Sequence, residues 1–244
     1  MKLEVKNLEK EFNNFKAVNS ISFKIENGQT LGLLGPNGCG KTTTIGMLLG
    51  LITPTKGEIL FDDVNLEKLK REKILSEVNF ASPYVELPKK LTVNENLEIY
   101  ARLYGVKNLK ERILEISADL DLKSFVNKKT GELSSGQKNR VSLAKSLINK
   151  PKILFLDEPT ARLDPDIGDF VRRYIEEYKT KNKISILLAS HNMNEVEMLC
   201  DEVIMMRSGE IVDSGTCESL IKKHGRNNLE ETFLKLARNK NELV

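Results

Sequence analysis

The fold of this 244-residue chain is decided by one stretch of its sequence, Gly35-Pro36-Asn37-Gly38-Cys39-Gly40-Lys41-Thr42. The stretch matches the pattern G-x-x-x-x-G-K-[ST], in which the glycines let backbone N–H groups turn inward around phosphate oxygens. The short apolar run Leu31–Leu34 precedes it, and Thr42–Leu51 has helical character. Strand, loop and helix in this order predict a nucleotide-binding α/β core, with the N-terminus of the helix facing the phosphates.

Polar side chains in and just after this loop have predicted contacts with a bound nucleotide. Lys41 reaches the β- and γ-phosphates, the Thr42 hydroxyl is a ligand of Mg²⁺, and Thr43 reaches the α-phosphate. Cys39 is interpreted as a small loop residue. The alternative for Cys39 is a reactive thiol, because a helix N-terminus lowers the pKa of a cysteine.

A second group of polar residues follows two apolar runs further along the chain. Asp157 and Glu158 end the run Ile153–Leu156, where an open parallel sheet presents residues to a ligand. We expect Asp157 to hold Mg²⁺ through water and Glu158 to act as a general base on the attacking water. His191 follows the next run, Ile184–Leu188, and is predicted to bond the γ-phosphate or that water.

The rest of the chain predicts strands at both ends. Alternating apolar residues indicate half-buried antiparallel strands near Leu3 and Val5 and again between Ile21 and Ile25. Further predicted elements are a turn at Asn27-Gly28, a strand at Gly57–Phe61, a late hairpin joining Val203–Met206 to Glu210–Val212, and a terminal helix at Leu229–Ala237.

The middle of the chain, from about residue 85 to 150, has helical periodicity. Thr92 and Glu95 have capping-box spacing, and Gly105 is a plausible stop for the helix that follows. Ser134 is predicted to cap a later helix that ends before Pro151. Apolar residues share faces of these helices, namely Leu97, Tyr100, Ala101 and Tyr104, then Ile113, Ile116 and Leu120, then Val141, Ala144 and Ile148.

Composition and charge argue against several classes of protein. Lys and Arg number 38 against 35 Asp and Glu, a balance of only +3, so a nucleic-acid partner is not expected. Three cysteines without a C-x-x-C pair argue against a disulfide framework or a zinc site and fit a reducing cytosol. The residues Met1–Lys6 lack the apolar region of a secretory signal. Apolar runs such as Ile186–Ala189 are far below the ~20 residues of a membrane helix, so we expect another chain to supply any membrane span.

Two more motifs give the chain a family resemblance. Leu133-Ser134-Ser135-Gly136-Gln137 precedes the Asp157-Glu158 strand end, and Ala161-Arg162-Leu163-Asp164 follows it. With the phosphate-binding loop and His191, these motifs stand in the order and spacing of the ATP-binding subunits of ABC transporters. From about Leu3 to Gly215, the chain resembles that family, and most of all the ATPases of ABC-2-type exporters.

The resemblance implies a P-loop α/β fold with a mixed sheet, an N-terminal antiparallel β subdomain and a helical subdomain inserted at about residues 85–150. It implies an ATPase domain at 1–225 and a short helical extension at 226–244. Phe12 matches the aromatic residue that stacks on adenine, with Phe15 as the alternative. Asp164 is similar to a residue that communicates between the two sites of a dimer.

The family pattern also implies partners. Two ATPase subunits enclose two ATP molecules, so that Ser134, Ser135, Gly136, Gln137 and Asp164 of one subunit act in trans on the ATP of the other. The second subunit is expected to be another copy or a related chain. A separate integral membrane permease is expected to hold the pair at the inner face of the cell membrane.

Two positions depart from the family pattern. Ser135 replaces the usual glycine, which adds only a hydroxyl group. The second departure is in the loop expected at Asn79–Tyr84. Relatives place a glutamine there, near Ser82 or Pro83, where it contacts Mg²⁺ and senses the membrane partner, and this chain has none. We therefore do not expect ATP hydrolysis to be coupled to the membrane partner through a glutamine at this position.

Soluble members of the same superfamily are the alternative. DNA-repair relatives interrupt the domain with a long coiled coil, which is absent between residues 42 and 133, and translation-associated relatives fuse two nucleotide domains where this sequence has one. A single-domain ATPase of iron–sulfur assembly has the same architecture. A regulatory chain that binds ATP without hydrolysing it is disfavoured, because Lys41, Asp157, Glu158 and His191 are all in place.

Overall fold

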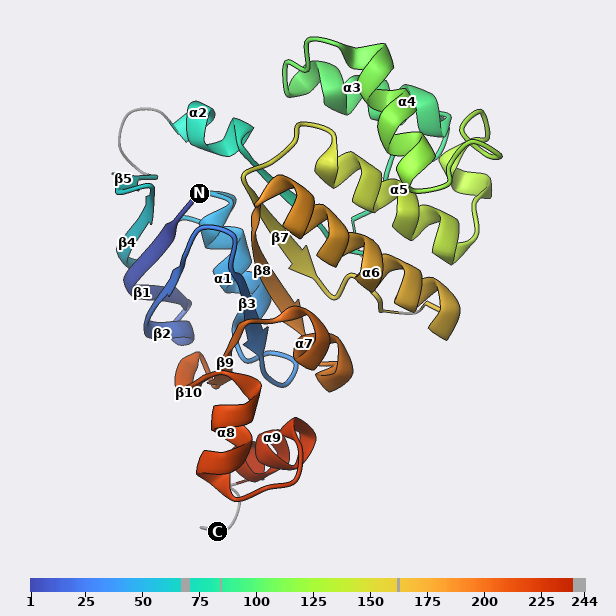
Figure 1. Cartoon of the computed structure of the whole chain (residues 1–244). Coiled ribbons are helices and arrows are strands. Elements are labelled where there is room, and N and C mark those ends of the chain that lie inside the picture. Colours follow the sequence, from blue (N-terminus) through green and yellow to red (C-terminus); the bar gives the residue numbers. More distant parts are fainter. Residues whose placement is uncertain (67–70, 84, 162, 239–244) are drawn as a thin grey trace.

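The computed structural model describes residues 1–66, 71–83, 85–161 and 163–238, and its centre is a six-stranded sheet (Figure 1). Its strand order is β10-β9-β3-β8-β7-β6, with parallel pairing throughout except for the antiparallel edge pair β9–β10. The sheet is therefore mixed, as expected. Its strands are β3 (Thr30–Leu34), β6 (Val78–Ala81), β7 (Ile153–Asp157), β8 (Ser185–Ser190), β9 (Glu202–Arg207) and β10 (Glu210–Gly215).

A second, antiparallel sheet is formed mostly by the N-terminal segment. Its order is β2-β1-β4-β5, and Leu3 pairs with Ile25 and Val5 with Phe23, all four with buried side chains. This confirms the strands predicted from alternation. The strands are β1 (Leu3–Phe12), β2 (Phe15–Ile25), β4 (Lys56–Phe61) and β5 (Val64–Asn65).

Helix α1 (Lys41–Leu48) lies between the two sheets and joins their apolar faces into one core. Ile45, Met47 and Leu48 are buried against residues of both sheets, including Phe61 and Phe155. The helix ends earlier than the predicted Leu51, because the chain turns at Gly50, whose φ is +66°. A positive φ of this kind is readily adopted by glycine and closes helices at their C-termini.

The predicted helical insertion is seen as a separate lobe, at the upper right of Figure 1. It contains α3 (Val93–Leu103), α4 (Leu109–Asp119), a 3₁₀ turn (Thr130–Glu132) and α5 (Ser135–Leu147). Reciprocal capping boxes close the N-termini of α3, through Thr92 and Glu95, and of α5, through Ser134 and Gln137. The apolar faces predicted for these helices form a second core with α6 (Pro165–Asn182) and the sheet.

Among the described elements that were not predicted from the sequence are β5, β6, α2 (Arg71–Ser76), α7 (Met193–Leu199) and α8 (Cys217–His224). The prediction of a loop at Asn79–Ala81 is wrong, because these residues pair in parallel with Leu154–Leu156 of β7. The polar Asn79 interrupts the apolar pattern, yet it is buried and donates a hydrogen bond to Asn149 Oδ1 at 2.9 Å.

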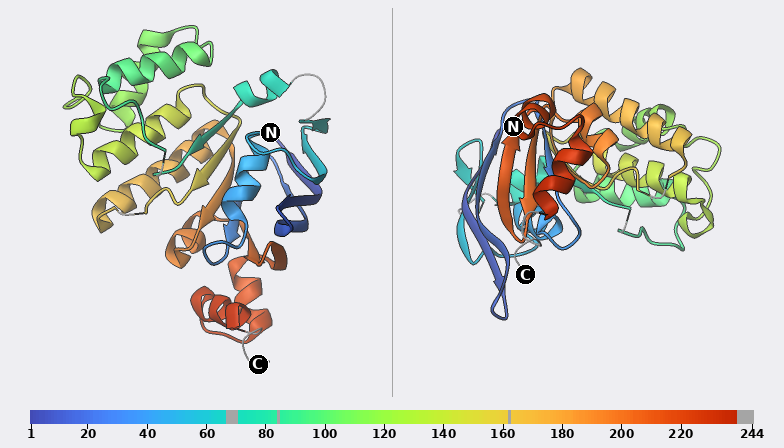
Figure 2. Two further views of the ribbon diagram at one scale, coloured as in Figure 1. Left: turned by 180° about the vertical axis from the view of Figure 1, so that it is seen from behind. Right: turned by 90° about the horizontal axis from the view of Figure 1, so that it is seen from below.

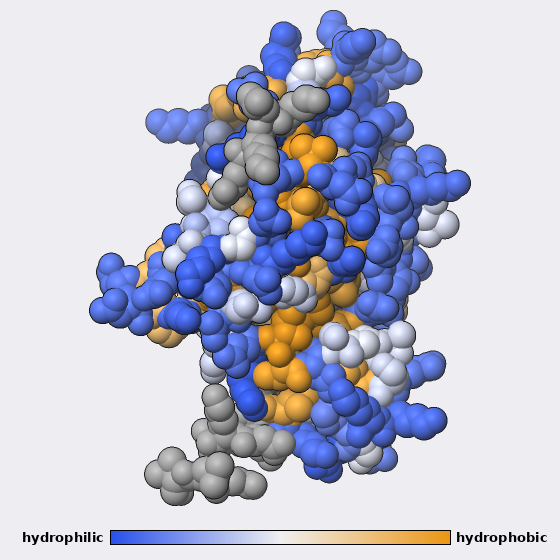
Figure 3. Space-filling model, turned by 90° about the vertical axis from the view of Figure 1, so that its left-hand side faces the viewer, coloured by the Kyte–Doolittle hydropathy of each residue, from blue (hydrophilic) through white to orange (hydrophobic). Residues whose placement is uncertain are grey.

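The C-terminal helices form a small third layer below the sheet in Figure 1. Helix α8 and α9 (Leu229–Arg238) pack on α7 (Met193–Leu199) and on β9, around Leu220 and Leu229. Figure 2 shows from two further sides that this layer and the helical lobe lie on different parts of the central sheet. Hydrophilic side chains cover most of the face that carries the antiparallel sheet, with an apolar strip between them (Figure 3).

Candidate functional site

The glycine-rich loop joins the end of β3 to the first residue of α1, as the motif predicts. Gly38 and Gly40 have φ of +79° and +110°. The loop is also packed tightly, since a Cβ at Gly40 would lie 2.6 Å from the carbonyl oxygen of Ala17. Lys41 is buried, and its Nζ donates to the carbonyl oxygens of Gly35 at 2.6 Å and Pro36 at 3.2 Å. The ammonium group is thus held inside the loop that would surround a phosphate.

Gly40→Ala is expected to destabilise the nucleotide-free chain by about 2–4 kcal/mol, because a strained φ and a backbone clash act together. Gly38→Ala is the matched control, since its φ is also positive but a Cβ there would meet nothing within 4 Å. Its expected cost is about 1 kcal/mol. Denaturant unfolding of both variants measures the difference, and equal costs would show that the approach to Ala17 is unimportant.

A cavity of about 850 Å³ opens beside this loop and collects residues from distant parts of the chain. The predicted site residues that line it are Phe12, Asn37, Gly38, Gly40, Lys41, Thr42, Thr43, Asp157 and Glu158. Gly35, Pro36, Cys39 and His191 are not among its described lining residues. Phe15 lines the cavity too, and its side chain is 64% exposed against 44% for Phe12. The geometry therefore leaves both aromatic rings available for a planar base.

Burial of Cys39 opposes the reactive-thiol alternative. The side chain is 2% exposed, and this burial raises the pKa of the thiol, although the nearby Lys41 acts in the opposite direction. A thiol with a raised pKa is a poor nucleophile at neutral pH. The interpretation of Cys39 as a small packing residue is thus favoured.

The two carboxylates lie where β7 ends at the edge of the cavity. Asp157 and Glu158 are 6% and 8% exposed. Burial, and next the negative charge of Glu158, raise the pKa of Asp157, while Lys41 and the Thr42 side chain oppose that rise. Asp157 is therefore close enough to Lys41 and Thr42 to interact with both.

His191 directly contacts Glu158. The distance between His191 Nδ1 and Glu158 Oε1 is 2.6 Å, and the imidazole is 58% exposed. In the sheet, β8 lies between β3 and β7, so the glycine-rich loop, the Asp157-Glu158 pair and His191 all follow the carboxyl ends of neighbouring strands. This is the edge at which parallel sheets bind ligands.

The residues predicted to act in trans are not among the described residues that line this cavity. Ser134 and Gln137 cap α5 through each other's side chains and backbone N–H groups, and Ser135 is exposed. A Cβ at Gly136 would lie 2.6 Å from Ile167 Cδ1, the movable end of a side chain on α6, so α5 and α6 approach each other closely at that position. Asp164 is the N-cap residue of α6, whereas Arg162 lies outside the described residues.

The strand end near the missing glutamine lies at the same cavity. Phe80 and Ser82 line it, and Ser82 is buried. Lys145 of α5 donates to the carbonyl oxygen of Phe80 at 2.8 Å, and burial lowers the pKa of this lysine to about 8. Helix α5, which begins within the motif Leu133–Gln137, is thus bonded to the strand that leads to Ser82.

A set of buried polar residues behind the Glu158–His191 contact was not predicted from the sequence. Asn139 of α5 donates to the carbonyl oxygen of Pro159 at 2.7 Å. Thr160 and Ser190 each donate to the carboxylate of Glu195. The two hydroxyl residues stand next to Glu158-Pro159 and His191, a position that could have marked them. No such signal separates the buried Glu195 from its exposed neighbour Glu197.

The fold and the site together define a P-loop nucleoside triphosphatase. The family model of ABC transporters matches residues 18–161, more than half of the chain. The chain belongs to the ABC transporter family and is an ATP-binding, ATP-hydrolysing subunit of such a transporter. None of the helices that the structure describes is long and apolar enough to cross a membrane.

Three comparisons show how far the similarity extends. The ABC transporter ATP-binding protein NatA of Bacillus subtilis (strain 168) is 37% identical, over 90% of this chain and 89% of NatA. The Nod factor export ATP-binding protein I of Burkholderia orbicola (strain AU 1054) is 35% identical, over 90% of this chain and 72% of that protein. A solved ATP-binding subunit of an ABC transporter superposes with a TM-score of 0.88 at 25% identity, covering 97% of this chain and 99% of the other.

Proposed function

We propose that this chain hydrolyses ATP through Glu158, His191 and Lys41 and drives the export of a substrate through a separate membrane permease. The observation that carries the proposal is the 2.6 Å contact between Glu158 and His191, beside a cavity that the phosphate-binding loop also lines. The phosphate loop and the acidic strand end thus line one space large enough for a nucleotide, and His191 is joined to that space through its contact with Glu158.

The donor set fits a magnesium ion. Mg²⁺ prefers hard oxygen ligands and is commonly held by one or two protein oxygens together with phosphates and water. Thr42 and Asp157 supply a hydroxyl and a carboxylate at the same cavity. When bound, the ion would neutralise charge on the β- and γ-phosphates. Its presence would also relieve the repulsion between the buried Asp157 and Glu158 carboxylates.

The chain's own residues supply the remaining steps. The Lys41 ammonium group exchanges its carbonyl contacts for phosphate oxygens, and the N–H groups around Gly38 and Gly40 bind the same anion. Glu158 accepts a proton from the attacking water. With Glu158 ionised, His191 Nδ1–H donates to its Oε1, which orients the imidazole at the edge of the γ-phosphate position.

The proposal includes a dimer around two ATP molecules. Adenine stacks on Phe12, with Phe15 as the neighbouring alternative, and the triphosphate lies on Gly35–Thr43. The second subunit, another copy or a related chain, closes the site with Ser134, Ser135, Gly136, Gln137 and Asp164. The exposure of Ser135, and the absence of these residues from the described lining of the chain's own cavity, support action in trans.

The transport part of the proposal rests on family membership and on the similarity to a Nod factor export subunit. The permease holds the ATPase pair at the inner face of the cell membrane, and no nucleic acid is involved. Residues 1–225 form the ATPase domain, with the helical subdomain at about 85–150, and residues 226–244 form the extension. Helix α8 ends at His224, which supports a boundary there.

We expect the full-length chain to co-purify from detergent-solubilised membranes with a multi-span protein encoded beside it. Phosphate release should be faster in that complex than in the chain alone, and ATP-dependent substrate flux in vesicles gives the direction of transport. A chain that turns over ATP at its full rate as a dimer without any membrane protein would instead support the soluble alternative of iron–sulfur assembly or translation.

A further inference from the structure

Glu195 has no role in the chemistry described above, yet its carboxyl group lies just behind the catalytic pair. It belongs to the first turn of α7 and is 1% exposed. Its Oε1 accepts a hydrogen bond from Thr160 Oγ1 at 2.7 Å, and its Oε2 accepts one from Ser190 Oγ at 2.6 Å. A buried carboxylate is costly unless it is hydrogen-bonded, so these two short contacts account for its presence there.

The two hydroxyl groups come from the two loops that carry the catalytic pair. Thr160 stands two residues after Glu158 at the end of β7, and Ser190 directly precedes His191 at the end of β8. Ser190 Oγ also accepts a hydrogen bond from the backbone N–H of Asn192 at 3.1 Å, on the other side of His191. One carboxylate therefore joins both loops from behind.

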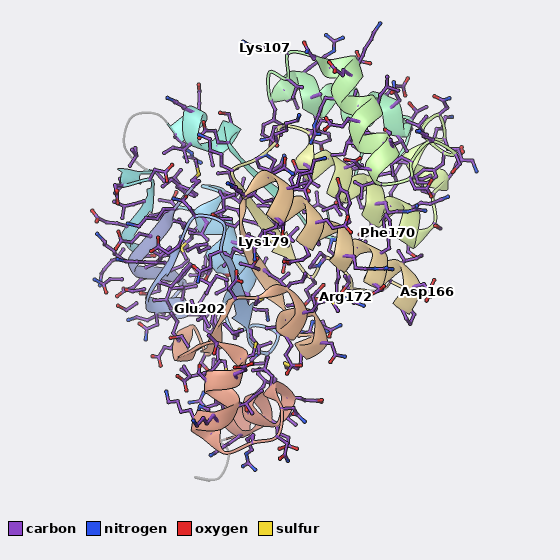
Figure 4. The ribbon with its side chains drawn as sticks, viewed as in Figure 1. Lys107, Asp166, Phe170, Arg172, Lys179 and Glu202 are labelled. Carbon is purple, nitrogen blue, oxygen red and sulfur yellow. The ribbon has the colours of Figure 1, made fainter. Side chains whose placement is uncertain are left out.

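The charges around Glu195 are consistent with this bridging role. Burial raises the pKa of Glu195, whereas the two hydroxyl donors and the positive charge of Arg172 act in the opposite direction. Arg172 projects from α6 on the side of that helix toward α7 (Figure 4). The negative charge of Glu158 adds to the rise. Of these groups, the Thr160 and Ser190 hydroxyls are the ones with direct bonds to the carboxyl oxygens.

The catalytic pair needs such support. The backbone of Glu158 has a φ of +53°. Residues other than glycine rarely adopt this left-handed conformation, so the surrounding structure must hold it in place. His191 is more than half exposed, so its ring depends on its backbone and on the contact with Glu158.

We propose that Glu195 is a positioning residue, which ties the Thr160 and Ser190 hydroxyls together and so holds Glu158 and His191 at their 2.6 Å contact. The inference rests on the proposed function for the importance of that pair in hydrolysis. Glu195 itself does not touch the nucleotide cavity, because it is absent from the described residues that line it.

The test compares Glu195→Ala and Glu195→Gln in the full-length chain, assayed with its membrane partner. Glu195→Ala removes both acceptors and is expected to lower kcat by about 10- to 100-fold, the scale of a small misplacement of catalytic groups. KM for ATP is expected to stay within about threefold, because substrate binding does not use this carboxylate. Glu195→Gln keeps the shape and one acceptor oxygen, so a smaller loss is expected. The control is Glu197→Gln on the exposed side of the same helix, which should leave kcat unchanged.

A second readout does not depend on turnover. The chain has only two histidines, so the ring resonances of His191 and His224 can be followed separately by NMR. In the Glu195 variants the His191 resonance is expected to shift while that of His224 stays. Thr160→Val and Ser190→Ala each remove one hydroxyl and should shift the His191 resonance in the same direction. These two variants replace Glu195→Ala in the test if that variant does not fold.

The outcomes separate the inference from the proposed function. An unmoved His191 resonance together with unchanged kcat in folded Glu195 variants would overturn the inference and leave the proposed function standing. A shifted resonance with unchanged kcat supports positioning by Glu195 and contradicts the catalytic role of the pair. In the double variant with His191→Ala, Glu195→Ala is expected to lower kcat by a smaller factor than it does alone, because only Glu158 is left to position, and a fully multiplicative loss would show that Glu195 acts elsewhere.

Discussion

Glu158→Gln is expected to lower the rate of ATP hydrolysis by about 10²- to 10⁴-fold while leaving ATP binding intact. The amide oxygen of glutamine can still accept the hydrogen bond from His191 Nδ1, so the geometry at the end of β7 is preserved. An amide cannot take a proton from the attacking water, so only the chemical step is lost. Phosphate release measures turnover, and equilibrium binding of ATP measures the first step.

The same variant tests whether ATP closes a dimer. If hydrolysis reopens two subunits that ATP has closed, then Glu158→Gln should accumulate as a dimer in MgATP and return to monomer when ATP is removed. Glu176→Gln, the same change on the exposed side of α6, is the control and should show neither effect. Turnover of Glu158→Gln within tenfold of the unchanged chain would show that another group activates the water.

The sequence predicted those parts of the fold whose signal is local. The phosphate loop, the capping boxes at Thr92 and Ser134, and the alternating strands each carry their pattern within a few residues. Strand β6 was missed because Asn79 breaks its apolar run, and only the contacts with β7 and Asn149 make a buried amide acceptable there. Helix α8 was missed because a single residue, Leu220, is buried in it.

In the candidate site, too, the residues with a local sequence motif were predicted and those that depend on tertiary contacts were not. Motifs identified Lys41, Asp157, Glu158 and His191, which the fold brings together at the ends of neighbouring strands. Their supporting contacts depend on the packing of α5 and α7 behind those strands. The bonds from Asn139 to Pro159 and from Thr160 to Glu195 join residues 20 and 35 positions apart in the sequence. No periodicity or motif in a single sequence specifies such pairs.

Arg112→Met is expected to destabilise the chain by about 2–5 kcal/mol, the largest loss of stability that we predict for a residue outside the nucleotide site. Arg112 lies in α4, and its side chain is 5% exposed. Its guanidinium group donates to the carbonyl oxygens of Leu147 and Ile148 and to the Tyr178 hydroxyl. Those carbonyl groups belong to the last turn of α5, where a helix has no internal donors left.

The buried arginine therefore joins three helices at a point where backbone groups need partners. Methionine retains an apolar stem of similar length but leaves both carbonyl oxygens without their donor, at about 1–3 kcal/mol each. Arg102→Met is the matched control, because Arg102 pairs with Glu98 on α3 with 69% of its side chain exposed. Exposed pairs of this kind contribute about 0.5 kcal/mol or less. Denaturant unfolding of both variants compares the loss of stability at the buried arginine with that at the exposed one. Equal small losses would mean that water reaches the end of α5 and satisfies its carbonyl groups, so that burial of Arg112 contributes little to holding the helical lobe on the core.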